Sequence, residues 1–148
     1  MTPARLDPDV VRNKLGEITR TLDALASVEG LTPERLGNDA IVRAAVERFV
    51  SRTVDLAVDV NSHLSVATIG RAPGDYRESF RMAGEAGAID TELAERLAPS
   101  VGMRNVIIHE YERLDLGRLA AAVPLALEDY REYVRHVARF VLEQTKSV

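Results

Sequence analysis

The chain has 148 residues and a formal net charge of −4, and its composition, 46% hydrophobic and 28% charged, predicts a single globular domain over residues 1–148. The lack of cysteine excludes a disulfide framework, a thiolate metal site and a catalytic thiol, and with no long apolar run or signal-peptide pattern we expect a cytoplasmic protein with no membrane association. The negative charge argues against a large nucleic-acid footprint, although it is compatible with a small local RNA site.

Apolar residues recur at helical spacing almost throughout the chain, and no strand-like alternation occurs, so the sequence predicts an all-α fold. The first helix is expected to begin at Pro8 with Asp7 as its N-cap, because aspartate accepts hydrogen bonds from free backbone N–H groups and proline suits a first turn. Gly30 is expected to end this helix. Residues 32–34 then predict a short turn or linker.

Two further helices are predicted in the middle of the chain. The longest is expected over residues 39–69, capped by Asn38 or Asp39 and stopped by Gly70. The next is expected over residues 75–86. The glycine-rich residues 84–87 are interpreted as a helix end rather than a phosphate-binding loop, because no strand precedes them.

Two prolines divide the last third of the chain in this prediction. Proline inside a helix removes a backbone hydrogen bond and clashes with the preceding turn. We therefore expect a short helix from Thr91 that stops at Pro99, a helix over 100–113 capped by Ser100, a turn over 116–122 and, around Pro124, a new helix over 123–145. The complete prediction is an all-α bundle of about five to six helices.

Four polar side chains gather in the predicted helix 100–113: those of Arg104, Asn105, His109 and Tyr111. At about 100° per residue, Asn105 and His109 share one face, whereas Arg104 lies roughly 140° from His109 and close to Tyr111. Arginine can hold a phosphate, histidine can exchange a proton and asparagine can orient either group. Together they would suffice for RNA cleavage without a metal ion. The alternative is a structural role, with Arg104 paired to an acid and His109 satisfied in the core.

The stretch from Arg104 to Tyr111 resembles the Arg-x4-His motif of the HEPN superfamily, and more narrowly the Arg-x4-His-x-Tyr form of HepT-like toxins. The similarity extends over the chain, through residues 45–48 and 58–64, Tyr76, Phe80, and residues 87–89, 92–93 and 102–103. It implies an HEPN-type helical bundle that acts as an endoribonuclease toxin. Arg104, His109 and Asn105 would be the catalytic residues, and no metal or other cofactor is expected.

The same resemblance implies a homodimer in which the two motifs face each other across a shared RNA-cleaving cleft. It also implies a cognate nucleotidyltransferase antitoxin of the MntA-like type, which would neutralise the toxin by AMPylation of Tyr111. Phosphate-linked adenosine beside Arg104 would place negative charge and bulk where the RNA phosphate is expected. The non-catalytic alternative is an HEPN module that binds a nucleotide or acts as a scaffold for a nucleotidyltransferase.

Asp55, Asp59 and His63 form a row at one-turn spacing on the long helix. Either this row is a polar stripe under the last helix or at the dimer edge, or Asp59 or His63 supports the cleft. Three groups on one helix without a fourth ligand are weak evidence for a metal site. The family's Asn-His pair is altered here to Asn61-Ser62-His63, and no role is assigned to Asn61 or Ser62.

The last helix offers weaker candidates. His136, Tyr130 and Tyr133 are expected at the surface or at an interface. Three arginines also recur every four residues: Arg131, Arg135 and Arg139. Since acidic residues lie close by, this row is interpreted as a solvated face, with an RNA-tracking patch as the alternative.

Overall fold

The computed structural model describes residues 5–146, and every regular element in that range is helical, which confirms the predicted all-α class. No helix in that range is long and apolar enough to cross a membrane. The elements, in chain order, are α1 (Pro8–Ala26), α2 (Pro33–Asn38), α3 (Ala40–Thr68), α4 (Tyr76–Glu85), α5 (Thr91–His109), the short 3₁₀ helix η1 (Tyr111–Arg113) and α6 (Leu116–Lys146).

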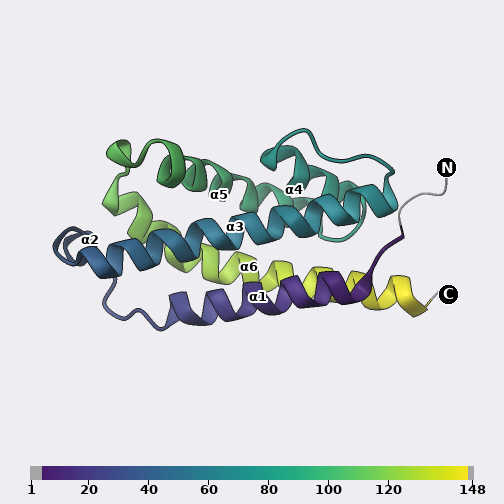
Figure 1. Ribbon diagram of the computed structural model, residues 1–148, viewed down its shortest axis with the longest axis horizontal. Coiled ribbons are helices and arrows are strands. Elements are labelled where there is room, and N and C mark those ends of the chain that lie inside the picture. The colour runs from purple at the N-terminus through teal and green to yellow at the C-terminus, as the bar shows by residue number, and fades with distance from the viewer. Residues whose placement is uncertain (1–4, 147–148) are drawn as a thin grey trace.

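The long helices α1, α3 and α6 pack along the length of the bundle, and α4 and α5 cover another side of α3 (Figure 1). α5 also packs against α6. The start of α1 and the end of α6 lie at one end of the bundle, whereas α2 and the turn between α5 and α6 lie at the opposite end (Figure 1). The second half of α5, which carries the polar cluster, therefore points toward the end far from the chain termini.

Side-chain caps begin five of the helices, as their sequences indicate. In each case a side-chain oxygen of the preceding residue accepts hydrogen bonds from N–H groups of the first turn; these residues are Asp7, Thr32, Asp39, Asp75 and Asp90. Such a cap typically stabilises a helix by about 1 kcal/mol. The starts predicted for the first helix and for the helix after Asp39 are confirmed.

The ends of α1 and the start of α2 differ from the prediction. α1 ends at Ala26 rather than near Gly30, and the Ser27 hydroxyl donates to the Ala24 carbonyl at 2.6 Å. Gly30, with φ of 63°, instead turns the loop that follows. Thr32 begins a true helical segment, α2, where a turn or linker was predicted.

The predicted breaks at Pro99 and Pro124 are wrong. α5 and α6 each continue through their proline, and α6, with 31 residues against 29 in α3, is the longest helix. Both prolines lie on the exposed side of their helix, where the carbonyl that loses its helical donor can bind water instead. Flanking core residues hold both halves of each helix: Leu97 and Val101 in α5, Val123 and Tyr130 in α6.

Tyr130 and Tyr133 are core residues, not the surface residues that the sequence predicted. They are 1% and 0% exposed and pack edge-to-face with each other and with Phe80 of α4, at ring-centroid distances of 6.0 to 6.4 Å. Each buried hydroxyl has a hydrogen-bond partner. The Tyr130 hydroxyl lies 2.6 Å from that of Ser100. Ser100 is not the predicted cap, because α5 begins at Thr91 and continues through Pro99.

The Tyr133 hydroxyl donates to the Asn61 side-chain oxygen at 2.5 Å, and the Asn61 amide donates to Ser79 at 3.2 Å. Asn61 is fully buried, so the residue left without a role is a core hydrogen-bonding residue that ties α3 to α4 and α6. Burial raises the pKa of the Tyr133 phenol, which therefore stays a neutral donor.

Candidate active site

Arg104 lies on the side of α5 that faces α3 and α4, and its side chain is only 17% exposed. Its Nε donates to Asp55 Oδ1 of α3 at 2.9 Å. Its guanidinium carbon lies 4.8 Å from the centre of the Tyr76 ring, a cation–π distance. Its Nη1 donates to the side-chain oxygen of the neighbouring Asn105 at 3.3 Å. Three different side chains thus fix the plane and direction of the guanidinium.

Tyr76, the first residue of α4, connects this arrangement to a second helix. Its hydroxyl donates to the same Asp55 Oδ1 at 3.0 Å. Burial, followed by the hydrogen bond and the charge of Asp55, raises the pKa of the Tyr76 phenol, so the phenol remains a donor at neutral pH. Asp55 Oδ1 therefore accepts from two donors at once and determines where both side chains point.

One edge of the Arg104 guanidinium remains available for a ligand. Within residues 5–146, Nη2 has no hydrogen-bond partner, whereas Nε and Nη1 are both engaged. An arginine held in place with a free N–H edge is suited to binding a phosphate oxygen, because its ordering is complete before the ligand arrives. A purely structural pairing uses Nε and Nη1 and leaves Nη2 to water, so the free edge is compatible with both alternatives.

His109 is the last residue of α5 and is exposed. Its imidazole makes no hydrogen bond within residues 5–146, so it is not the satisfied core histidine of the structural alternative. It lines a pocket of about 350 Å³ with Glu110, Tyr111, Glu112 and Arg113, which form the helix end and η1. An unpaired and accessible imidazole is free to exchange a proton with a ligand.

Tyr111 occupies a different place from the one predicted. α5 ends at His109, so helical arithmetic does not extend to Tyr111, which lies in η1 and is 61% exposed. It lines the pocket of His109, and Arg104 does not. The structure thus brings Arg104 together with Asn105, and His109 together with Tyr111. Asn105 and His109 are both exposed residues of α5, one helical turn apart.

The row of Asp55, Asp59 and His63 faces two directions. Asp59 pairs with Lys14 of α1 at 3.4 Å, and His63 Nε2 accepts a hydrogen bond from the Asp7 backbone N–H at 3.0 Å. The two residues singled out as supports of the cleft therefore contact α1, and Asp55 is the member of the row that contacts Arg104. The sequence offers one indication that Asp55 is special, because it is a carboxylate between residues that are buried in α3. The sequence does not show that its partner is Arg104.

Elsewhere, the described part of the chain has one group of three side chains that could approach a metal ion, Asp90, Glu132 and His136, with ligand atoms within 4.8 Å of one another. All three residues already have partners, and His136 Nε2 lies 3.6 Å from Glu132 Oε1. Asp90 caps α5 at Leu93 N, and Glu132 accepts from Arg96 at 2.7 Å. The group joins the start of α5 to α6 and includes no residue of the polar cluster.

Comparison with known proteins gives a consistent result. The family model described as ribonuclease HepT-like matches residues 14–137. The chain is 29% identical over 138 residues to a tRNA nuclease HepT of Aphanizomenon flos-aquae, covering 93% of both chains. It is 25% identical over 126 residues to an mRNA nuclease HepT of Shewanella oneidensis, covering 85% of this chain and 94% of the relative.

A solved structure with the same fold is the tri-AMPylated HEPN toxin of Shewanella oneidensis in complex with its MNT antitoxin. The TM-score is 0.78 at 24% identity, over 87% of this chain and 96% of the toxin. At this level of identity the structural likeness concerns the helical fold.

Proposed function

Because this chain belongs to the ribonuclease HepT-like family, we propose that it is the toxin of a toxin–antitoxin pair and cleaves RNA without a metal ion. The observation that carries this proposal is that one helix presents two complementary groups. Arg104 is held in place with one free N–H edge, and His109 is accessible. The two named relatives act on tRNA and on mRNA, so RNA is the substrate class we infer.

In the proposed reaction, His109 takes the proton of a ribose 2′-hydroxyl. The 2′-oxygen then attacks the adjacent phosphorus, and the bond from phosphorus to the 5′-oxygen of the next nucleotide breaks. That oxygen leaves with a proton, and the products are a 2′,3′-cyclic phosphate and a 5′-hydroxyl end. Arg104 stabilises the negative charge that builds up on the phosphate oxygens, and Asn105 helps to hold the guanidinium.

We propose that two copies of the chain form the working site. The reaction needs a base for the 2′-hydroxyl and an acid for the leaving oxygen, and each chain has a single histidine in its motif. Ile108, beside His109, is 43% exposed, so a second copy that brought the two motifs together would bury apolar surface at the same place. His109 of one protomer would then serve as base and that of the other as acid.

The proposed off switch is AMPylation of Tyr111 by a nucleotidyltransferase antitoxin. The related toxin of known structure is tri-AMPylated and is bound to an MNT antitoxin. Here the Tyr111 side chain is accessible and shares the His109 pocket, so an added phosphate and adenosine would stand beside the base. Negative charge and bulk at that position would exclude an RNA phosphate.

The test is RNA cleavage by purified protein in the presence of EDTA. His109→Ala and Arg104→Ala should each lower the cleavage rate by roughly 10²–10⁴-fold, as expected for loss of a proton-transfer group or of the charge that stabilises the transition state. His136→Ala, on α6, is the matched control and should cleave at nearly the wild-type rate.

Undiminished cleavage by both motif variants would overturn the mechanism. RNA or nucleotide binding by the wild-type protein with no cleavage would instead identify the non-catalytic scaffold.

A further inference from the structure

We propose that a groove along the outer side of α5 binds the RNA strand beside the cleaved bond. This basic groove is a cavity of about 500 Å³, and it is lined by Arg77, Pro99, Gly102, Met103, Val106, Arg113, Leu114, Asp115 and Arg118. The inference rests on the proposed function, and it adds to it a second RNA-binding site, outside the motif.

The floor of the basic groove is a stripe of small and apolar residues on α5. Pro99, Gly102, Met103 and Val106 follow one another at steps of three, one and three residues, so they share one side of the helix. Met103 and Val106 are half-buried, and Leu114 closes the floor after η1. Such a surface can make van der Waals contacts with the sugar and base faces of a single strand, without the aromatic rings on which bases stack.

Three arginines from three different elements surround this floor: Arg77 of α4, Arg113 of η1 and Arg118 of α6. All three are exposed. Within residues 5–146, Arg77 and Arg118 form no ion pair, and Arg113 reaches Glu110 only at 4.0 Å. The single carboxylate of the lining, Asp115, accepts a hydrogen bond from the Arg118 backbone N–H. The groove is therefore locally positive on a chain whose net charge is −4.

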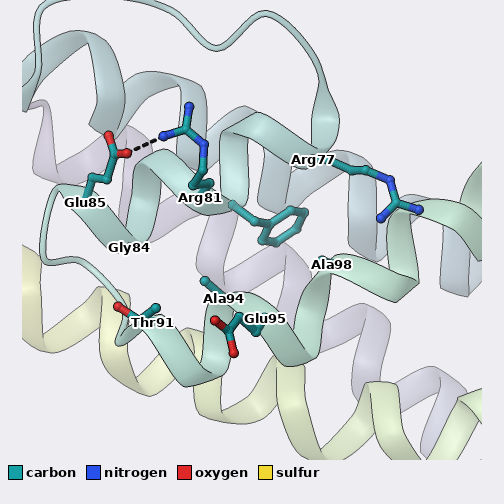
Figure 2. Close-up of a pocket in the computed structure, with 9 residues that line it drawn as sticks. Arg77, Arg81, Gly84, Glu85, Thr91, Ala94, Glu95 and Ala98 are labelled. Atoms are coloured by element: carbon teal, nitrogen blue, oxygen red, sulfur yellow. Dashed lines mark hydrogen bonds and ion pairs between the residues drawn. The ribbon is translucent and has the colours of Figure 1, made fainter.

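A neighbouring cavity shows that this charge is particular to the basic groove. It is similar in volume, about 480 Å³, and lies over the first half of α5. There Arg81 pairs with Glu85 and Glu78, and Glu95 adds a further carboxylate (Figure 2). That cavity is electrostatically balanced, so it does not suit a phosphate chain.

Arg77 lies between the two cavities and is directed toward the basic groove. In Figure 2 its guanidinium points away from the Arg81–Glu85 pair, toward the part of α5 that follows Ala98. A Cβ atom at Gly102 would lie 3.3 Å from Arg77 Nη2, a tight contact. The absence of a side chain at Gly102 thus allows the guanidinium to lie close to the backbone of α5, over the floor of the groove.

The basic groove leads to the proposed cleavage site. Arg113 lines both this groove and the pocket of His109 and Tyr111. Gly102 and His109 are seven residues apart, about 10 Å along the helix axis, so a strand held at His109 continues over the floor within one or two nucleotides. Charge complementarity and continuity with His109 both identify the occupant as the phosphate backbone of single-stranded RNA.

The test measures binding of a labelled single-stranded RNA at several salt concentrations, in a His109→Ala background that prevents cleavage. Adding Arg77→Ala and Arg118→Ala should weaken binding about tenfold and reduce the slope of log affinity against log salt by about 1.4, the value for two lost contacts with a single strand. The matched control adds Arg12→Ala and Arg20→Ala, which remove the same charge from exposed positions on α1, a helix that does not pack against α5, and should change both quantities little.

Equal behaviour of the two double variants would overturn the inference. So would a groove variant that loses affinity for the antitoxin but keeps its affinity for RNA, because the groove would then be a protein-docking surface. These outcomes are separate from a failure of the proposed function, which would appear as RNA cleavage that does not depend on Arg104 and His109.

Discussion

The two ends of the polar cluster are built in opposite ways. Arg104 is 17% exposed and is held by Asp55, Tyr76 and Asn105. His109, five residues later, is exposed, and its side chain makes no hydrogen bond within residues 5–146. The end proposed to bind phosphate is thus held by partners within one chain, whereas the end proposed to transfer protons has no partner among residues 5–146.

The position of each residue in the bundle explains this difference. Arg104 faces the junction of α3 and α4, so two further helices supply partners for it. His109 lies in the last turn of α5, where the chain leaves the helix for η1, a turn that contains no buried residue. Substitutions at the two ends should therefore affect different steps of the reaction.

Among the residues that surround Arg104 and His109, the largest effect is expected at the fixed end, from Asp55→Ala. This change removes the acceptor of both Arg104 Nε and the Tyr76 hydroxyl, and a hydrogen bond to a charged group contributes about 1.5–3 kcal/mol. If the guanidinium that Asp55 holds in place stabilises the transition state, loss of this hydrogen bond should lower the cleavage rate by roughly 10–100-fold. Single-turnover cleavage measures it, and Asp55→Asn, which keeps an oxygen acceptor, should recover part of the rate.

Asp59→Ala is the matched control, because Asp59 lies one turn along α3 and pairs only with the exposed Lys14. A single-turnover rate as slow for this control as for Asp55→Ala would mean that the row acts as a whole. It would remove the distinction between Asp55 and its neighbours.

A smaller effect is expected from Tyr76→Phe. The ring that lies under the guanidinium is kept, and only the hydroxyl that donates to Asp55 is lost. Asp55 keeps its hydrogen bond to Arg104 in this variant, so only part of the effect of Asp55→Ala should remain, and we expect a rate reduction of about two- to tenfold. The single-turnover rate again reports it. A loss as large as that of Asp55→Ala would show that the phenol itself takes part in the reaction.

The smallest effect on cleavage is expected at the open end, from Tyr111→Phe. The Tyr111 hydroxyl makes no hydrogen bond within residues 5–146, and surface substitutions of this kind usually change free energies by less than about 0.5 kcal/mol. The cleavage rate should stay within about twofold of wild type. The variant should nevertheless escape neutralisation, with no gain of AMP mass after incubation with the antitoxin and ATP. AMP mass on this variant would place the modification elsewhere.

Local signals in the sequence account for the parts of the fold that were predicted well. Asp7 and Asp39 precede helical patterns and cap them, because capping depends on a few adjacent residues. Pro99 and Pro124 misled the prediction for the complementary reason. A proline costs a helix about 3 kcal/mol in isolation, and only the packing of buried residues on both sides, which local pattern does not reveal, outweighs that cost.

The same contrast between local signals and long-range packing applies to the candidate site. Arg104, Asn105 and His109 are close in sequence, so the resemblance of this short motif to HEPN sequences was enough to propose that they act together. The contact between Asp55 and Arg104 spans 49 residues and depends on how α3 packs against α5. Tyr130 and Tyr133 were misplaced at the surface because their hydroxyl partners, Ser100 and Asn61, come from distant helices.

The short turn η1 has a consequence for how the molecule can vary. It joins two long helices, yet none of its three side chains is buried, so no core contact determines which residues occupy it. Residues in such a turn can change, or carry a bulky covalent group, without disturbing the folding equilibrium of the bundle. A tyrosine retained at this position in other members of the family would therefore reflect selection on its chemistry, since packing places no demand on it.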